Sequence, residues 1–273
     1  MNQTSRPHNP GPNWPFLTVM SLLGMVYVVL IVAMIWADLT FTTPHHIWKA
    51  LASPDIQFSV RLSLFTCTLA TIFSLLVAIP AAYLMSRFSF PGKKLVDAIL
   101  DIPIVLPPLV IGLSLLILFQ MPVGRAIERF IPFTYAVPGV VLAQFAVACA
   151  FAVRTMLTTF DQISPRGEQV AMTLGCNRAG AFWRVTLPES RRGILTAATL
   201  AWARSLGEFG PILVFAGATR MRTEVLPTTV FLELSVGNIE AAVAVSLLMI
   251  IAALTVLTVA RAFGLRAARE RVL

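Results

Sequence analysis

Two oppositely charged side chains, Arg204 and Glu208, stand four residues apart within an apolar stretch of this 273-residue chain. A spacing of four places both on one face of a helix. Each would cost about 2.5–3.5 kcal/mol at the middle of a membrane, so both should face protein or water. Two interpretations are open: a buried ion pair that holds the helix against neighbours such as Arg61 or Asp101, or the wall or gate of a polar pathway.

The same charged residues could also serve an enzyme embedded in the membrane. Such an enzyme needs a nucleophile, a metal set, or an acid and a base within reach of each other. The sequence has no HExxH or GxSxG motif, and its three cysteines form no CxxC pair. The adjacent His45 and His46 lack the spacing that places two ligands on one face. Enzymatic chemistry and a metal site on this chain are therefore disfavoured.

The composition indicates a chain surrounded by lipid. Hydrophobic residues make up 57% and charged residues only 12% of it, whereas soluble domains carry about 25% charged residues. The apolar runs are continuous rather than alternating, which favours helices over a barrel. We expect an all-α membrane protein with about six spans, at about 16–36, 59–85, 98–119, 137–158, 195–217 and 241–263.

The net charge of +8 could indicate nucleic-acid binding, but the basic residues lie between the apolar runs and indicate topology instead. Segments 1–15, 86–97, 159–194 and 264–273 carry more than twice as many Lys and Arg residues as the segments on the other side. The positive-inside rule therefore places both termini in the cytoplasm. We expect a disordered tail at 1–15, a first span with its outer loop at 16–55, and a basic cytoplasmic tail at 264–273.

Two of the expected spans are unusual. The third contains Asp101, Pro103, Pro107 and Pro108, so we expect an irregular helix in the interior, where neighbours can bond the freed carbonyl groups. The fifth contains glycines around its ion pair. The candidate pathway or gate residues there are Arg204, Ser205, Gly207, Glu208, Phe209 and Gly210.

The segment 159–194 is polar and long enough for two short helices. Gly175 can adopt a positive φ after the first helix, and Asn177 is a good N-cap for the second. Pro188 is expected to end the second helix and to redirect the chain toward the fifth span.

Phe182 and Trp183, flanked by Arg178 and Arg184, should be exposed on the second of these helices. Aromatic and arginine side chains are enriched where proteins dock. They also suit a helix that lies among lipid headgroups. The residue types alone leave both interpretations open.

This segment resembles the coupling loop of the permease subunits of type I ABC importers. That loop has the pattern Glu-Ala-Ala, three residues, Gly, nine residues, Ile, one residue, Leu-Pro. Counting from Gly175 places 169–171 on the triplet and Val185 and 187–188 on the final positions. Gln, Val and Val replace the first Glu, the second residue and the Ile, and Glu168 lies one residue early. The residues assigned to the coupling loop are Glu168, Gln169, Ala171, Gly175, Phe182, Trp183, Leu187 and Pro188.

The resemblance covers about residues 56–263 and implies the type I ABC importer permease fold. It implies that the loop docks a separate cytoplasmic ATPase, and that a second permease copy, in a homodimer, completes the pathway. It further implies that an extracytoplasmic binding protein delivers the solute. The chain has no GxxxxGK[ST] loop, so ATP and Mg²⁺ should bind the ATPase subunit, with no cofactor and no enzyme activity on this chain. The expected location is the inner or plasma membrane of a prokaryote.

The stretch 203–210, Ala-Arg-Ser-Leu-Gly-Glu-Phe-Gly, resembles the fifth-span signature of the molybdate, tungstate and sulfate permeases. Arg220 and Arg222 in an outer segment would attract a dianion, although they could equally contact headgroups or a binding protein. Molybdate or tungstate is the first choice of solute, and sulfate or thiosulfate the second. Importers of thiamine, iron or phosphonate share the loop and are alternatives. A channel without an ATPase is a remote alternative, because the loop spacing argues against it.

Overall fold

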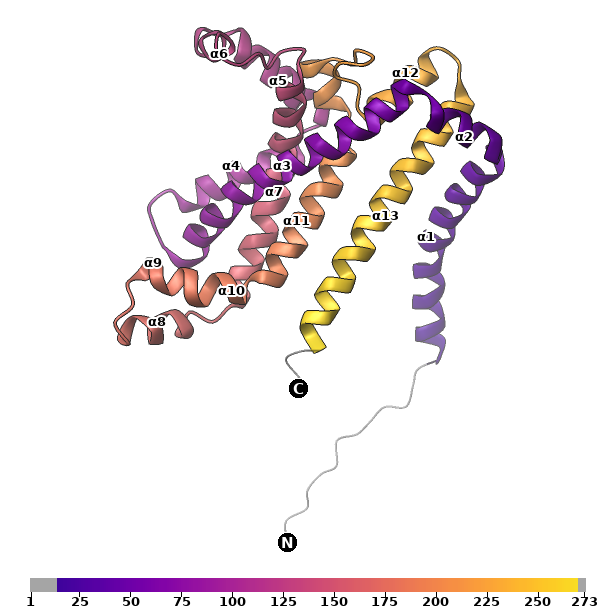
Figure 1. Cartoon of the computed structure of the whole chain (residues 1–273). Coiled ribbons are helices and arrows are strands. Elements are labelled where there is room, and N and C mark those ends of the chain that lie inside the picture. Colours follow the sequence, from indigo (N-terminus) through magenta and orange to yellow (C-terminus); the bar gives the residue numbers. More distant parts are fainter. Residues whose placement is uncertain (1–13, 270–273) are drawn as a thin grey trace.

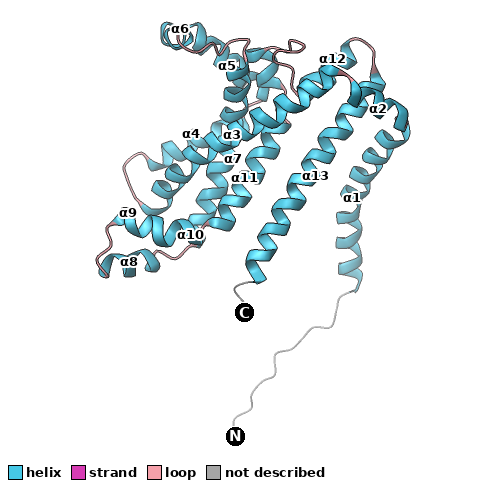
Figure 2. Ribbon diagram, in the orientation of Figure 1, coloured by secondary structure: helices cyan, strands magenta, loops and turns pink. Residues whose placement is uncertain are grey.

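The computed structural model describes residues 14–269, and every regular element in this range is a helix (Figure 2). The tail expected at 1–15 lies almost wholly outside the described residues, as do residues 270–273. Residues 264–269 of the expected basic tail continue the last helix.

Within the described residues, four helices are long and apolar enough to cross a membrane, and a bent helix pair provides a fifth candidate span. The four are α1 (Trp14–Phe41), α3 (Pro54–Arg87), α7 (Val137–Gln162) and α13 (Ile239–Arg269). The bent pair is α4 (Lys93–Val105) with α5 (Pro108–Gln120), whose axes differ by 112°. The all-α membrane class is therefore confirmed.

The expected fifth span is not one continuous helix. It consists of α11 (Arg191–Leu206), a break at residues 207–209, and the widened π-helical turn η2 (Ile212–Ala216). The 16 residues of α11 are too few to cross the membrane as one helix. This break explains why the structure has four or five continuous spans where the sequence predicts about six.

The ends of the molecule separate as the charge pattern predicts (Figure 1). The helices α8 (Arg166–Thr173), α9 (Arg178–Ala181) and α10 (Leu187–Glu189) lie at the same end as the start of α1 and the end of α13. The short helices α2 (Pro44–Ala52), α6 (Pro122–Glu128) and α12 (Leu226–Ser235) lie at the opposite end. Both described ends of the chain are thus on the side of the predicted coupling loop.

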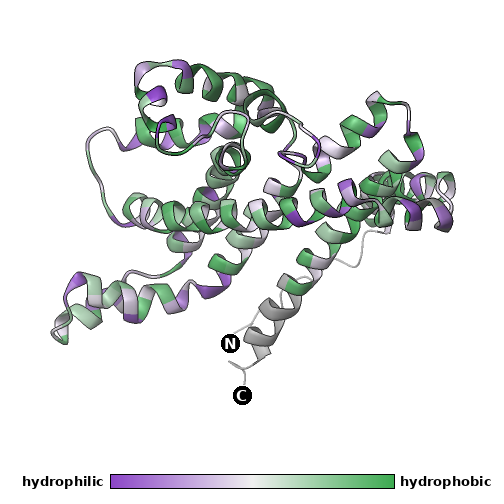
Figure 3. Cartoon of the chain, turned by 45° about the horizontal axis from the view of Figure 1, so that its top comes forward, coloured by the Kyte–Doolittle hydropathy of each residue, from purple (hydrophilic) through white to green (hydrophobic). Residues whose placement is uncertain are grey.

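Small side chains hold the centre of the bundle together. The helices α3, α7 and α11 pack closely through buried alanines, with Met156 and Phe160 filling the space between them. Small residues let helix backbones approach closely inside a membrane. The outer helix surfaces are largely apolar (Figure 3), and α1 has no buried residue. These surfaces are suited to lipid or to another membrane helix.

The third span is irregular, as its prolines predict, but its interior position is not confirmed in the single chain. The break falls just before Pro107 and Pro108, because proline cannot donate the next helical hydrogen bond. The helix α4 has no buried residue, and α5 buries only Ile111, Gly112 and Phe119.

Candidate functional site

The predicted coupling loop contains two short helices separated by a glycine. Gly175 has a φ of +93° after α8. The side chain of Asn177 accepts a hydrogen bond from the backbone N–H of Gly180 at 2.7 Å and thereby caps α9. Both local predictions are confirmed. The left-handed backbone at Gly175 reverses the chain so that the two helices lie against each other.

The outer face of this loop exposes large apolar side chains to solvent. Val170 and Leu174, four residues apart and hence on one side of α8, are 58% and 82% exposed. Trp183 is 65% exposed on the turn η1 (Phe182–Thr186). We call Val170, Leu174 and Trp183 the docking face. Exposed apolar side chains of this kind are suited to burial against a partner protein or among lipid headgroups.

Phe182 does not belong to that face, contrary to the sequence prediction. Its ring is half-buried and lies 4.7 Å from the ring of Tyr83, centroid to centroid. The adjacent residues point in different directions because successive helical positions lie about 100° apart around the axis. Phe182 therefore attaches the loop to the bundle, while Trp183 faces outward.

Glu168 is the buried carboxylate of the loop, and Gln169 is exposed. The Glu168 carboxylate accepts hydrogen bonds from the Tyr83 hydroxyl at 2.9 Å, the Arg87 Nε at 2.9 Å and the Thr186 hydroxyl at 2.7 Å. Burial raises the pKa of the Glu168 carboxyl, but these hydrogen bonds and the positive charge of Arg87 outweigh it, so the pKa lies below its ordinary value. Glu168, one residue before the family triplet, thus makes the structural contacts, whereas Gln169, the first residue of the triplet, is exposed.

Pro188 does not end the second helix as predicted. The helical run continues from α9 through η1 and α10, and the chain turns only at Ser190. The π-helical turn just before the proline absorbs the missing N–H donor, since widened turns accommodate such irregularities. Ala171 and Leu187 are half-buried, and Pro188 is exposed.

The break in the fifth span brings several of the candidate pathway residues together. The Arg204 Nη1 lies 2.6 Å from the Glu208 Oε2, so these residues form the i, i+4 ion pair that their spacing predicts. Glu208 is 1% exposed, and the carbonyl of Ser205 accepts a hydrogen bond from the Gln144 side-chain amide of α7 at 3.2 Å. Gln144 therefore bonds the carbonyl end of α11 where the helix stops.

In the single chain, the candidate pathway residues differ in their exposure. Ser205, Glu208 and Gly210 are buried, Arg204 and Phe209 are half-buried, and Gly207 is exposed. Asp101 is not a neighbour of the ion pair as one interpretation expects, because Asp97 and Asp101 both bind Arg154 of α7. Arg61 is exposed at the surface of α3.

The breaks of the third and fifth spans touch each other. A Cβ on Gly112 would lie 2.7 Å from the Pro211 Cα, and one on Gly210 would lie 3.1 Å from the Leu109 backbone nitrogen. A Cβ at position 112 would clash with the backbone of the other segment, and one at position 210 would be tightly crowded, so glycine allows this close approach. In membrane transporters, interrupted helices frequently surround the solute path.

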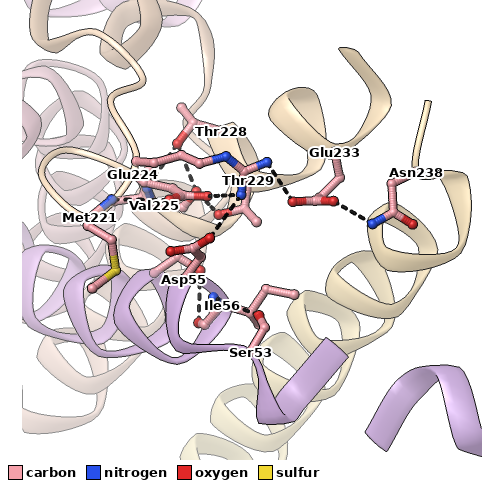
Figure 4. Close-up of polar contacts among 12 residues, drawn as sticks. Ser53, Asp55, Ile56, Met221, Glu224, Val225, Thr228, Thr229, Glu233 and Asn238 are labelled. Atoms are coloured by element: carbon pink, nitrogen blue, oxygen red, sulfur yellow. Dashed lines mark hydrogen bonds and ion pairs between the residues drawn. The ribbon is translucent and has the colours of Figure 1, made fainter. Parts of the chain in front are cut away.

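At the outer end, Asp55, Glu224 and Glu233 come together from three segments (Figure 4), and their common partner is Arg220. Its guanidinium lies 2.8 Å from Glu233 of α12, 3.4 Å from Asp55 at the start of α3, and 3.9 Å from Glu224 of its own loop. Burial raises the pKa of the Glu224 carboxyl above its ordinary value. Because carboxylates surround it, Arg220 is not the free positive charge that would attract a dianion. Arg222 is exposed.

No motif in the sequence indicated a role for Tyr83, Arg87 and Thr186 of the inner contacts, or for Gln144 beside the break. A basic residue in the last turn of a span, such as Arg87, is an available signal, because cations stabilise helix C-termini. Nothing in the sequence pairs it with a carboxylate 81 positions away. Within the described residues no group of three or more His, Cys, Asp or Glu side chains could hold a metal ion.

Comparison with known proteins places this geometry in a family. Residues 74–269 match the family described as "Binding-protein-dependent transport system inner membrane component". The sulfate transport system permease protein CysT of Escherichia coli is 31% identical over 251 residues, which are 90% of this chain and 88% of the relative. The molybdenum transport system permease protein ModB of Mycobacterium tuberculosis is 33% identical, over 91% of this chain and 93% of the relative.

A solved structure shares the fold. The permease of a bacterial ABC transporter involved in the import of alginate superimposes with a TM-score of 0.75 at 18% identity, covering 92% of this chain and 95% of that chain. At this identity the likeness establishes the fold alone. Because the family match covers well over half of its length, this chain belongs to the inner-membrane components of binding-protein-dependent transport systems, the permease subunits of ABC importers, whose ATPase is a separate subunit.

Proposed function

We propose that this multi-pass inner-membrane permease carries a tetrahedral oxyanion, with molybdate or tungstate first and sulfate or thiosulfate second. The observation that supports an oxyanion is the full-length similarity, at 31–33% identity, to permeases named for sulfate and for molybdenum. The Gly-Glu-Phe-Gly form of residues 207–210 favours molybdate or tungstate. Thiamine, iron and phosphonate are the alternative solutes, which only the shared loop pattern supports.

The ATPase subunit binds ATP and Mg²⁺, and hydrolysis of this ATP supplies the energy for transport. The docking face contacts that subunit. Three exposed apolar side chains around a basic loop suit a groove on a soluble protein, since they would be buried on binding. A second copy of the chain completes the pathway, and a binding protein delivers the solute from outside. The meeting of the two broken spans at Gly112 and Gly210 is the part of the chain best suited to line that pathway.

The docking role is tested by the variant Trp183→Ala in the full chain, co-purified with its ATPase. Loss of a central aromatic anchor weakens binding by about 2 kcal/mol, which is about thirtyfold in Kd. The matched control is Trp48→Ala, because Trp48 is similarly exposed at 75% but lies in α2 at the opposite end. Equal retention of the ATPase by both variants would contradict docking through this face.

The solute is tested in proteoliposomes that contain the chain, its ATPase and its binding protein. Radiolabelled molybdate and sulfate are supplied in separate assays, each in competition with unlabelled tungstate or thiosulfate. ATP-dependent uptake of molybdate that tungstate inhibits is the expected result. Uptake of sulfate alone would select the second choice, and uptake of neither anion would exclude the oxyanion.

A further inference from the structure

The guanidinium of Arg87 connects the ends of three helices. It belongs to the last turn of α3, and its Nε binds Glu168 of α8 at 2.9 Å. Its two terminal nitrogens donate to the backbone carbonyls of Phe160 and Ile163, each at 2.9 Å. Those carbonyls lie at the C-terminal end of α7, where helical N–H donors run out, although the Ile163 N–H also donates to the Phe160 carbonyl at 3.2 Å. Arg87 therefore caps α7 while it holds α8.

The Glu168 carboxylate continues this connection into the second half of the loop. Its Oε1 accepts from both Arg87 and the hydroxyl of Thr186, a residue of η1 that is fully buried. Its Oε2 accepts from Tyr83, one turn before Arg87 on α3. The Arg87 and Glu168 side chains are only 11% and 8% exposed, and their charges cancel. The Arg87–Glu168 pair with these hydrogen-bond donors favours one geometry. Loss of any donor would leave a buried polar group without a hydrogen-bond partner.

Aromatic rings reinforce the same junction. The ring of Tyr83 lies 4.7 Å from the ring of Phe182 in the loop and 5.8 Å from that of Phe160 in α7. Edge-to-face pairs at these distances are favourable and specific in direction. The loop is thus fixed to both long helices by hydrogen bonds and by packing, within the described residues.

The docking face lies directly beside these anchors in the sequence. Trp183 follows Phe182, and Val170 lies two positions after Glu168 on α8. The exposed side chains face away from the bundle, while their neighbours hold α3 and α7. We expect a displacement of the docking face to displace the ends of both helices, because hydrogen bonds and ring contacts link the loop to them directly.

Farther along the same helix, α7 reaches the broken fifth span. The Gln144 amide of α7 donates to the Ser205 carbonyl, which lies in the last turn of α11 before the break. The single helix α7 thus connects two places. Its C-terminal end contacts the coupling loop, and Gln144 on the same helix contacts the interrupted fifth span.

We propose that Tyr83, Arg87, Glu168 and Thr186, which we call the loop anchor, are positioning residues that transmit movement of the docking face to α3 and α7. This inference rests on the proposed function, because it requires an ATPase that moves the loop. The loop anchor itself does not touch the ATPase, since Glu168 and Thr186 are buried within the chain and the partly buried Tyr83 hydroxyl is bonded to Glu168. Its loss should uncouple ATP hydrolysis from transport and leave the two subunits associated.

Two substitutions remove one donor each and preserve shape. Tyr83→Phe removes the hydroxyl that binds Glu168 and keeps the ring contacts. Thr186→Val removes the other hydroxyl, and Thr186→Ser is the matched control because it restores the donor with a smaller side chain. Each variant is purified with its ATPase and reconstituted with the binding protein. Three quantities are measured: the ATPase retained, the stimulation of ATP hydrolysis by the binding protein, and the labelled molybdate or sulfate carried per ATP hydrolysed.

Tyr83→Phe and Thr186→Val should retain the ATPase fully. They should lower both the stimulation and the anion carried per ATP by about fivefold or more, the usual lower range of coupling between sites. Thr186→Ser should match the wild type. A purely structural role would lower complex yield and transport together, and the serine variant would share the defect.

Two results would overturn the inference. Normal coupling in both hydroxyl-deletion variants would show that the loop anchor transmits nothing. Loss of ATPase association in those variants would show that the network only shapes the docking face. Failure of the wild-type chain to bind an ATPase is a different result, which would instead remove the proposed function on which the inference rests.

Discussion

Charge is balanced differently at the two ends of this molecule. At the cytoplasmic end, one buried carboxylate, Glu168, has one arginine and two hydroxyl groups as donors. At the outer end, one arginine, Arg220, faces the three carboxylates of Asp55, Glu224 and Glu233. The inner group pairs one carboxylate with one arginine, whereas the outer group has three carboxylates for one arginine, with Lys49 and His45 lining the same pocket. The inner hydrogen bonds therefore favour one geometry. The three outer carboxylates can bind a proton or a basic partner.

The largest expected effect distinguishes the two arginines. Arg87→Ala leaves the buried Glu168 without its counter-ion and α7 without its cap, which should cost about 3–5 kcal/mol. Arg220→Ala should cost less, about 1–2 kcal/mol, because the Arg220 side chain is 37% exposed, against 11% for Arg87, and is therefore already partly solvated. The measurement is thermal unfolding of the purified chain in detergent micelles.

The exposed arginines Arg61 and Arg222 provide matched controls for this comparison. Arg61 lies on the same helix as Arg87, and Arg222 lies on the same loop as Arg220, so each is replaced by alanine. Both should leave the unfolding temperature close to that of the wild type, since exposed charges contribute little. An effect of Arg220→Ala as large as that of Arg87→Ala would contradict the difference between the two ends.

The sequence predicted features that depend on neighbouring residues and on the lipid bilayer. Local features were predictable because they depend on near neighbours: the positive φ at Gly175, the cap at Asn177, and the pairing of Arg204 with Glu208. Long apolar runs predicted the membrane class and the side of each end, because lipid imposes length and charge rules.

Features that depend on tertiary contacts were not predictable from the sequence. The expected partners of Asp101 were wrong, because which helices adjoin it is decided by packing of the whole bundle. Phe182 and Trp183 are alike in type, and only the position of Tyr83 decides which one is buried. The break in the fifth span was missed because its apolar residues continue on both sides of Gly207.

The pH dependence of stability should have opposite signs at the two ends. Hydrogen bonds and Arg87 lower the pKa of Glu168, so its stabilising contribution is present above pH 4.5 and is lost as the pH falls through the lowered pKa. Burial raises the pKa of Glu224, so its ionisation removes stability as the pH rises from 4.5 through the raised pKa.

Two glutamine variants measure these contributions separately. Glu168→Gln should be less stable than the wild type at pH 7, and the gap should close as the pH falls below 4.5. Glu224→Gln should be at least as stable as the wild type at pH 7, and its advantage should shrink as the pH falls toward 4.5. Unfolding temperatures from pH 4 to pH 8 give both curves, and curves of the same sign would refute the contrast.

The smallest expected effect concerns the helix cap beside the outer cluster. The Asn238 amide donates to Glu233 at 2.7 Å, and its oxygen accepts from the backbone N–H of Ala241 at the start of α13. Asn238→Ser keeps a capping oxygen and loses the donor to Glu233, which should cost about 0.5–1 kcal/mol.

Asn238→Asp also keeps the cap but places another carboxylate against Glu233 (Figure 4). If negative charge is already in excess at this end, the aspartate variant should be less stable than the serine variant at pH 7, because like charges repel. The two variants should converge at about pH 4, where carboxylates begin to take up protons. Thermal unfolding at both pH values separates the loss of a donor from the addition of a charge. An aspartate variant equal to the serine variant at pH 7 would contradict an excess of negative charge at this end.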